Sequence, residues 1–137
     1  SILRVPGIYA GNRLPIDRLQ SGMPALEDSQ DVYTNHIHAD DLAKLIEVAI
    51  FRARPQRVIN ASDSSYMKMG EYFDLVAQYC DLPKPPRVSK EELKGRVSPM
   101  MLSFMQESRR LKNDRIAELG YELRYPTVES YLRASLK

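Results

Sequence analysis

The sequence predicts an α/β fold with a few strands and a mostly helical lobe. Residues 32–39 alternate imperfectly as an extended strand, residues 41–52 repeat apolar side chains at helical spacing, and residues 57–61 form a short apolar strand. A strand, a helix and a second strand in this order indicate a parallel crossover. Further helices are predicted from Met69 and after four capping residues: Ser89, Ser98, Asn113 and Thr127.

The junction of the first strand and helix of this unit concentrates polar side chains. His36 and His38 are two residues apart on the predicted strand, so they share one strand face. Leu42 and Leu45 begin the apolar face of the helix that follows. We therefore expect Asp40 to be the N-cap, with its carboxylate accepting from free N–H groups of the first turn.

The other elements are predicted in order along the chain. Residues 2–5 are a short apolar strand, and glycines at positions 7 and 11 follow it and allow a sharp turn or the close approach of a ligand. Residues 14–20 form a short helix, and the helix from Met69 ends at Cys80, which we expect in the core. The helix predicted after Ser98, to about residue 108, is rich in methionine and packs either in the core or on a partner.

Composition limits the functional classes. The 137 residues carry 20 Lys and Arg against 18 Asp and Glu, for a net charge of +2, a balance that argues against a nucleic-acid binder. The single cysteine excludes an internal disulfide and fits a reducing compartment, so a cytoplasmic location is expected. No apolar run approaches the roughly 20 residues of a membrane helix, and residues 1–4 lack the features of a signal peptide.

Three kinds of site can be weighed on residue types alone. The pattern His-x-His followed by two aspartates could ligate a metal, but we favour local hydrogen bonding by these side chains and predict no metal site. A Ser-His-Asp hydrolase would need a Gly-x-Ser-x-Gly elbow, which the sequence lacks. Arg109 and Arg110 form a basic cluster with Lys112, either a solvated surface or an anion site.

Three stretches together carry a resemblance. They are Ile-Leu-Arg-Val-Pro-Gly-Ile-Tyr-Ala-Gly at 2–11, Asn-His-Ile-His-Ala-Asp-Asp-Leu-Ala at 35–43, and Ser-Arg-Arg-Leu-Lys-Asn at 108–113 with Leu-Gly-Tyr at 119–121. Their order and spacing resemble the C-terminal half of an extended short-chain dehydrogenase/reductase. The group is the NAD-dependent epimerase/dehydratase, or nucleoside-diphosphate-sugar epimerase, family. The resemblance implies a C-terminal fragment of a Rossmann-type protein, with residues 1–137 as one substrate-binding domain and the N-terminal dinucleotide-binding part absent.

The same resemblance assigns site residues. Pro6 and Gly7 would border the nicotinamide carboxamide of NAD or NADP. Substrate contacts would come from Tyr9, Gly11, Asn35, His36, His38 and Arg109. The substrate would be a small molecule, and in much of the family it is a nucleotide sugar. Here Thr34 and Asn35 stand where such epimerases typically carry an Arg-Asp pair, and a hydroxyl cannot replace a guanidinium on a diphosphate.

Two family features are missing from the sequence. It contains no glycine-rich turn of the form Gly-x-x-Gly-x-x-Gly, and none of its eight tyrosines has a lysine four residues on. We therefore predict no catalytic residue in this chain, no tight dinucleotide binding by it alone, and an NAD(P)-dependent epimerase, dehydratase or reductase as the full-length protein. The alternatives are a non-catalytic dinucleotide sensor and a protein-interaction module. A homodimer through exposed strand edges or the methionine-rich helix is also expected.

Overall fold

The computed structural model describes residues 2–52, 54–100 and 111–135. Two compact units make up this part of the chain. Unit 1 is built from residues 2–14, 35–52, 54–66 and 111–135, and unit 2 from residues 15–34 and 67–100. Arg109 and most of the predicted methionine-rich helix lie outside the described residues, although Pro99 and Met100 are helical after Ser98, as predicted.

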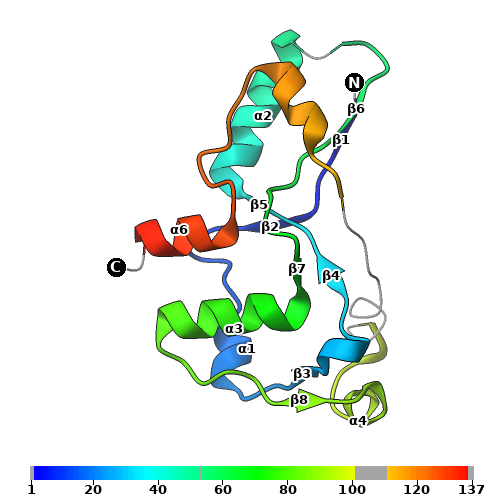
Figure 1. Ribbon diagram of the computed structural model, residues 1–137, viewed down its shortest axis with the longest axis vertical. Coiled ribbons are helices and arrows are strands. Elements are labelled where there is room, and N and C mark those ends of the chain that lie inside the picture. The colour runs from blue at the N-terminus through cyan, green and yellow to red at the C-terminus, as the bar shows by residue number, and fades with distance from the viewer. Residues whose placement is uncertain (1, 53, 101–110, 136–137) are drawn as a thin grey trace. The chain divides into compact units, whose positions relative to one another are not determined.

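Unit 1 contains two pairs of short parallel strands (Figure 1). Its elements are β1 (Ile2–Arg4), β2 (Gly7–Tyr9), β5 (His36–His38), α2 (Ala39–Arg52), β6 (Val58–Asn60), the 3₁₀ helix η2 (Asp114–Leu119) and α6 (Val128–Ser135). Strand β1 pairs with β6, and β2 pairs with β5. The predicted strand–helix–strand order is therefore present in β5, α2 and β6, but β5 and β6 pair with consecutive N-terminal strands rather than with each other.

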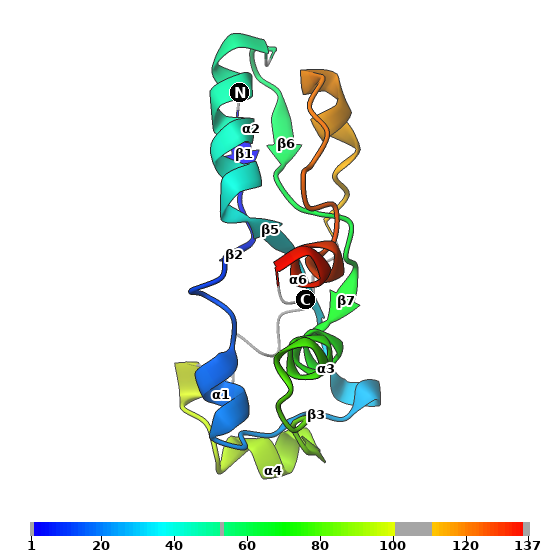
Figure 2. The ribbon, with the colours of Figure 1, turned by 90° about the vertical axis from the view of Figure 1, so that its left-hand side faces the viewer.

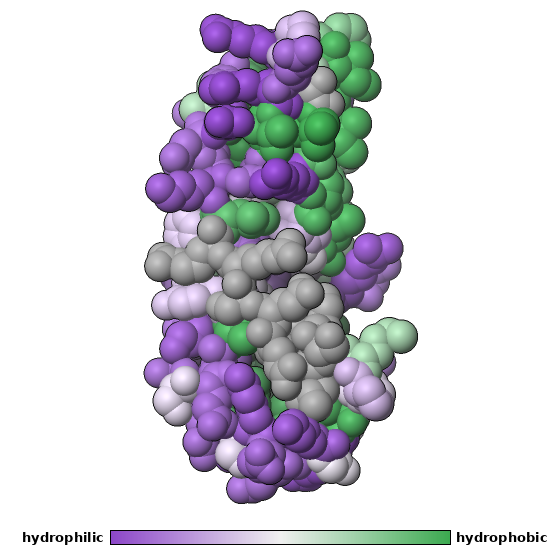
Figure 3. Space-filling model, turned by 90° about the vertical axis from the view of Figure 1, so that its right-hand side faces the viewer, coloured by the Kyte–Doolittle hydropathy of each residue, from purple (hydrophilic) through white to green (hydrophobic). Residues whose placement is uncertain are grey.

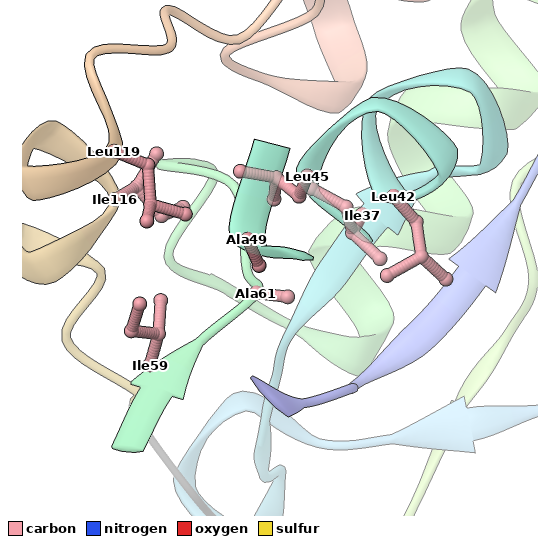
Figure 4. Close-up of a cluster of buried hydrophobic side chains, with 8 residues drawn as sticks. All are labelled: Ile37, Leu42, Leu45, Ala49, Ile59, Ala61, Ile116 and Leu119. Atoms are coloured by element: carbon pink, nitrogen blue, oxygen red, sulfur yellow. The ribbon is translucent and has the colours of Figure 1, made fainter. Parts of the chain in front are cut away.

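The core of unit 1 lies between α2, the strands and η2. Figure 4 shows this cluster, in which β5, α2, β6 and η2 each contribute side chains: Ile37, Leu42, Leu45, Ala49, Ile59, Ala61, Ile116 and Leu119. Leu3 and Ile8 pack against it from β1 and β2. Each large aliphatic side chain buried in this way contributes about 1.5 to 3 kcal/mol, so the cluster fixes how α2 sits on the strands.

The start of α2 differs from the prediction. The helix begins at Ala39, directly after β5, and the His38 Nδ1 atom accepts the Asp40 N–H at 3.0 Å. The imidazole thus takes the capping position that we assigned to Asp40, whose side chain is 68% exposed. Asp40 was the wrong N-cap because the strand runs into the helix with no intervening residue.

Unit 2 is mainly helical. Its elements are α1 (Ile16–Gln20), β3 (Ala25–Leu26), the 3₁₀ helix η1 (Asp28–Gln30), β4 (Tyr33–Thr34), β7 (Met67–Lys68), α3 (Met69–Cys80), β8 (Arg87–Val88) and α4 (Lys90–Lys94). The pairs β3–β8 and β4–β7 are parallel and antiparallel, respectively. The bounds of α3 and the cap of α4, where Ser89 Oγ accepts the Glu92 N–H, confirm the sequence prediction.

No helix of the described ranges is both long enough and apolar enough to cross a bilayer.

Candidate functional site

The pairing of β2 with β5 brings the predicted site residues of unit 1 together. Gly7 lies opposite His36 and Tyr9 lies opposite His38, and the Gly7 N–H donates to the Asn35 carbonyl at 3.2 Å. Pro6 and Gly11 flank β2 in sequence. Residues from two stretches about 30 positions apart therefore form one wall, and Arg109, which lies outside the described residues, is the exception.

Exposure divides these residues into two groups. Gly7 and Gly11 are exposed, and Pro6 and Asn35 are half-buried, so their atoms are accessible to a ligand. Tyr9, His36 and His38 are buried, at 1%, 8% and 4% exposure. The accessible part of the wall is thus mostly backbone, and the aromatic side chains lie behind it.

An aromatic cluster supports the wall from within unit 1. The His38 ring centroid lies 5.1 Å from Tyr9, 4.6 Å from Tyr125 and 4.5 Å from Tyr131. Such spacings are typical of edge-to-face and tilted aromatic pairs. Because Tyr131 belongs to α6, the cluster attaches the C-terminal helix to β5 and β2. The sequence analysis missed Tyr125 and Tyr131 because neither belongs to a recognisable local pattern.

Gly11 is close to the same cluster. A Cβ atom built on Gly11 would lie 2.9 Å from the Tyr131 Oη atom, closer than side chains approach in folded proteins. On Gly7 a Cβ would lie 3.4 Å from the Asn35 carbonyl oxygen, a tolerable contact. A side chain at Gly11 would therefore press against the Tyr131 hydroxyl. At Gly7 the missing side chain mainly leaves the backbone accessible to a ligand.

Asn35 is positioned by a long-range hydrogen bond. The Leu111 N–H donates to Asn35 Oδ1 at 2.9 Å. A second asparagine, Asn113, was predicted to cap the helix that follows it, but its side chain donates instead to the Ser62 carbonyl and Ser64 Oγ at 3.0 and 3.1 Å. The segment 111–113 thus connects the wall to the turn after β6.

Asp41 is the most strongly held carboxylate in the site region. It is fully buried, and the Tyr121 hydroxyl donates to its Oδ1 atom at 2.6 Å. The Arg124 N–H donates to Oδ1 at 2.8 Å and the Tyr125 N–H donates to Oδ2 at 2.9 Å. Burial and this hydrogen bond raise the pKa of Tyr121 to about 12, so its hydroxyl stays a donor. Asp41 therefore fixes residues 121–125 beside the wall.

Three further buried titratable groups lie nearby. Desolvation by burial lowers the pKa of His36 to about 4 and also lowers the pKa of His38, against the raising effects of Asp40 and Asp41. Burial raises the pKa of Asp63 to about 7, although its Oδ1 atom accepts the Ser65 N–H. At neutral pH both imidazoles are therefore uncharged, which suits a supporting role better than anion binding.

In the described residues, no group of metal ligands marks this wall. In ranges 2–52, 54–100 and 111–135 no three His, Cys, Asp or Glu side chains lie close enough to hold a metal ion. One surface hollow, of about 320 Å³, lies on α2 and is lined by Lys44, Glu47, Val48, Phe51 and Arg52. None of these residues was predicted to bind a ligand, and we assign the hollow no role.

Comparison with solved structures shows which fold this is. A conserved protein of unknown function from Silicibacter pomeroyi DSS matches 96% of the chain at 30% identity with a TM-score of 0.81. A human epimerase family protein, solved with NADPH, matches 96% at 15% identity and a TM-score of 0.77. A protein provisionally assigned as an NAD-dependent epimerase/dehydratase, from Methylobacillus flagellatus, matches 99% at 28% identity and a TM-score of 0.62.

The match covers only part of each of these structures. The chain spans 46%, 46% and 45% of their lengths, respectively. Neither a scan against protein-family models nor a search of curated proteins gives a match. The chain thus has an α/β fold that matches about half of an NAD-dependent epimerase/dehydratase.

Proposed function

We propose that the chain is the substrate-binding portion of an NAD(P)-dependent oxidoreductase of the epimerase/dehydratase type, inactive by itself. The observation that carries the proposal is the exposed backbone of Gly7 and Gly11, held in register beside Asn35 by the pairing of β2 with β5. The match to about half of such proteins, one of them solved with NADPH, supports it.

In this proposal the chain binds and orients rather than transfers hydride. A nicotinamide, when bound, supplies the hydride exchange. Pro6 and Gly7 border its carboxamide, and Gly7 can do so because no Cβ occupies the approach. The substrate-binding side of the site is formed by six residues: Tyr9, Gly11, Asn35, His36, His38 and Arg109. The buried Tyr9, His36 and His38 contribute chiefly by fixing the strands behind it.

The substrate is a small molecule. It is bound without the two charge-assisted hydrogen bonds that an arginine at position 34 would donate. In unit 2 the Thr34 hydroxyl donates to the Met67 carbonyl at 3.4 Å, so it is directed to the neighbouring strand β7. A guanidinium at that place would offer two parallel donors to a diphosphate. The proposed substrate class is therefore one that does not depend on that contact.

A chimera tests the proposal. In the chimera, the segment of the Methylobacillus flagellatus protein that this chain matches is exchanged for this chain. Calorimetry then measures the binding of NADH and of NADPH to the chimera. We expect micromolar binding of one dinucleotide, and at least tenfold weaker binding in the Gly7→Val chimera because the added side chain fills the approach. Gly95→Val, at an exposed glycine in unit 2 with φ of −83°, is the matched control and leaves binding unchanged.

A folded chimera that binds neither dinucleotide would refute the proposal. So would a Gly7→Val chimera that binds as tightly as the parent.

A further inference from the structure

The turn after β6, residues 62–65, connects two other parts of unit 1. The Asp63 N–H donates to the His36 carbonyl of β5 at 2.7 Å. The Ser65 Oγ atom accepts the Val128 N–H, at the start of α6, at 2.9 Å. Figure 2, like Figure 1, shows α6 beside β5. The turn therefore holds α6 next to the strand that forms part of the wall of the candidate site.

The carboxyl group of Asp63 lies in a setting that disfavours its charge. Figure 3 shows hydrophilic side chains over much of one face of the molecule, where water solvates charge, but Asp63 is only 3% exposed. Its Oδ1 atom accepts the Ser65 N–H at 3.0 Å, and its Oδ2 atom has no hydrogen-bond partner among the described residues. A buried carboxylate is stable only when donors or a cation compensate its charge. This setting therefore fits the neutral acid.

The titratable groups around Asp63 do not compensate an ionised carboxylate. Burial raises the pKa of Asp63 to about 7, the hydrogen bonds from Ser65 lower it less, and the Asp41 carboxylate of α2 adds to the rise. On β5, burial lowers the pKa of His36 to about 4, so this imidazole is neutral at pH 7. The other titratable side chains on the segments next to the turn do not affect the pKa of Asp63: Tyr66, Lys112, Arg124, Tyr125 and Glu129.

A strained residue follows the turn. Tyr66 has a φ of 47°, in the left-handed region that a bulky residue rarely adopts. Its hydroxyl donates to Asn113 Oδ1 at 3.1 Å, and the Asn113 side chain donates in turn to the Ser62 carbonyl and to Ser64 Oγ. Backbone strain of this kind persists only where the surrounding contacts hold it. If the turn loses its contacts, Tyr66 can relax, and the strain therefore favours release of the turn.

We propose that Asp63 is a proton-dependent switch for the substrate-binding side of the candidate site. While its carboxyl group is neutral, the turn binds β5 and holds α6 so that Tyr131 packs on His38, with its hydroxyl beside Gly11. When the carboxyl group loses its proton, the uncompensated charge draws the turn into water, and α6 separates from the wall. The inference rests on the proposed function for what the wall binds, whereas the switch itself is a property of the folded chain.

The switch acts between about pH 4 and pH 7. Asp63 has an ordinary pKa of 3.8 when the turn is open and a pKa of about 7 when it is closed. The neutral acid therefore stabilises the closed form fully below about pH 4, and this stabilisation is lost as the pH rises to about 7. Above that pH the balance no longer depends on Asp63. The wall is thus supported most firmly at mildly acidic pH.

Amide hydrogen exchange of the full 137-residue chain, measured from pH 5 to pH 8, tests the switch. The amides of Asp63 and Val128 report the bonds of the turn to β5 and α6, and the amide of Leu45, in the core of α2, is the reference. Protection is calculated relative to an unstructured peptide at the same pH, which removes the direct effect of pH on exchange. We expect the two reporting amides to be at least tenfold less protected than Leu45 at pH 8, because the opening is local.

The variant Asp63→Asn isolates the contribution of this carboxyl group. It cannot ionise, and it keeps an oxygen for the Ser65 N–H. The ratio of Val128 protection in the variant to that in the parent should rise at least tenfold from pH 5 to pH 8. The opposing effect of His36 is present in both proteins and cancels in this ratio. Asp81→Asn, at the left-handed C-cap of α3 where asparagine is tolerated, is the matched control, and its ratio stays constant.

Two exchange results would overturn the inference: a constant ratio for Asp63→Asn, or a Val128 amide as protected as that of Leu45. A second measurement needs no variant. The carboxyl carbon of Asp63, followed by NMR in the parent, should titrate near pH 7, and a midpoint near pH 4 would equally refute the switch. No dinucleotide takes part in these measurements. A chimera that fails to bind one therefore counts against the proposed function only, and a constant ratio counts against the switch only.

Discussion

Buried polar side chains distinguish the two units. Those in the described part of the chain all belong to unit 1: His36, His38, Asp41, Ser62 and Asp63. In unit 2 the buried residues that the structure describes are hydrophobic, glycine or proline. Its polar contacts include one at a helix start, where Asp31 accepts the Gly70 N–H at 2.7 Å, and one ion pair between half-buried side chains, Arg87 and Asp74. The stability of unit 1 should therefore depend on particular polar partners and on pH, and that of unit 2 on hydrophobic faces and local caps.

The largest expected effect is at Asp41. Asp41→Ala leaves one hydroxyl and two backbone N–H donors without their acceptor inside unit 1, and we expect a loss of about 3 to 5 kcal/mol in the free energy of unfolding. Asp40→Ala changes an exposed side chain and should cost less than about 0.5 kcal/mol. Urea denaturation measures both, and similar losses in the two variants would show that the buried carboxylate does not organise unit 1.

The second effect is a pH dependence with two opposing parts. Asp63 has a native pKa of about 7 against an ordinary 3.8, so its contribution to stability falls as the pH rises from about 4 to 7. His36 has a native pKa of about 4 against 6.5, so its contribution is lost as the pH falls from about 6.5 to 4. Between pH 4 and 6.5 the two slopes have opposite signs and largely cancel.

The variant Asp63→Asn separates these parts. It stays neutral and keeps an oxygen for the Ser65 N–H. Relative to the parent, it should gain stability progressively from pH 4 to 8, by at most about 4 kcal/mol at about 1.4 kcal/mol per pKa unit. Its own stability should then rise with pH between about 4 and 6.5 because of His36. Chemical denaturation at several pH values tests this, and a constant difference from the parent would contradict it.

The smallest effect belongs to unit 2. Ser89 Oγ accepts the Glu92 N–H at 3.3 Å at the start of α4, and Ser89→Ala should cost about 1 kcal/mol. No titrating group takes part in this cap, so the loss should be the same at pH 5 and pH 8. A loss that varies with pH would remove the distinction between the two units.

The same contrast explains what the sequence could predict. Three predicted features depend on residues within about four positions of one another. They are helix α3, the Ser89 cap of α4, and the cap at Thr127, whose Oγ1 atom accepts the Ser130 N–H. Asp41 instead binds residues 80 to 84 positions away, and no local pattern reports this. Asp40 was preferred as the cap because both aspartates precede an apolar helix face, and only the structure shows that His38 fills that position.

Local sequence patterns also could not predict which strands pair with each other. Strands β1, β5 and β6 lie at nearly the predicted places. Strand β2 was not predicted, because the glycines at positions 7 and 11 indicated a turn, and the partners of all four strands depend on contacts across more than 25 residues. The wall of the candidate site, with Gly7 opposite His36 and Tyr9 opposite His38, follows from that pairing. The resemblance to a family named these residues, while Tyr125 and Tyr131, which pack on His38, were found only in the structure. The roles of the named residues in binding remain predictions.

Titration of the 137-residue chain with NADH and NADPH tests the central claim most directly, namely that this chain supplies the substrate side of a dinucleotide enzyme and not the phosphate cradle. The sequence has no glycine-rich turn to place backbone N–H groups around a pyrophosphate. Calorimetry should therefore show no saturable heat for either dinucleotide below roughly millimolar concentration, the range in which weak contacts alone operate. A micromolar dissociation constant for either one would contradict the account.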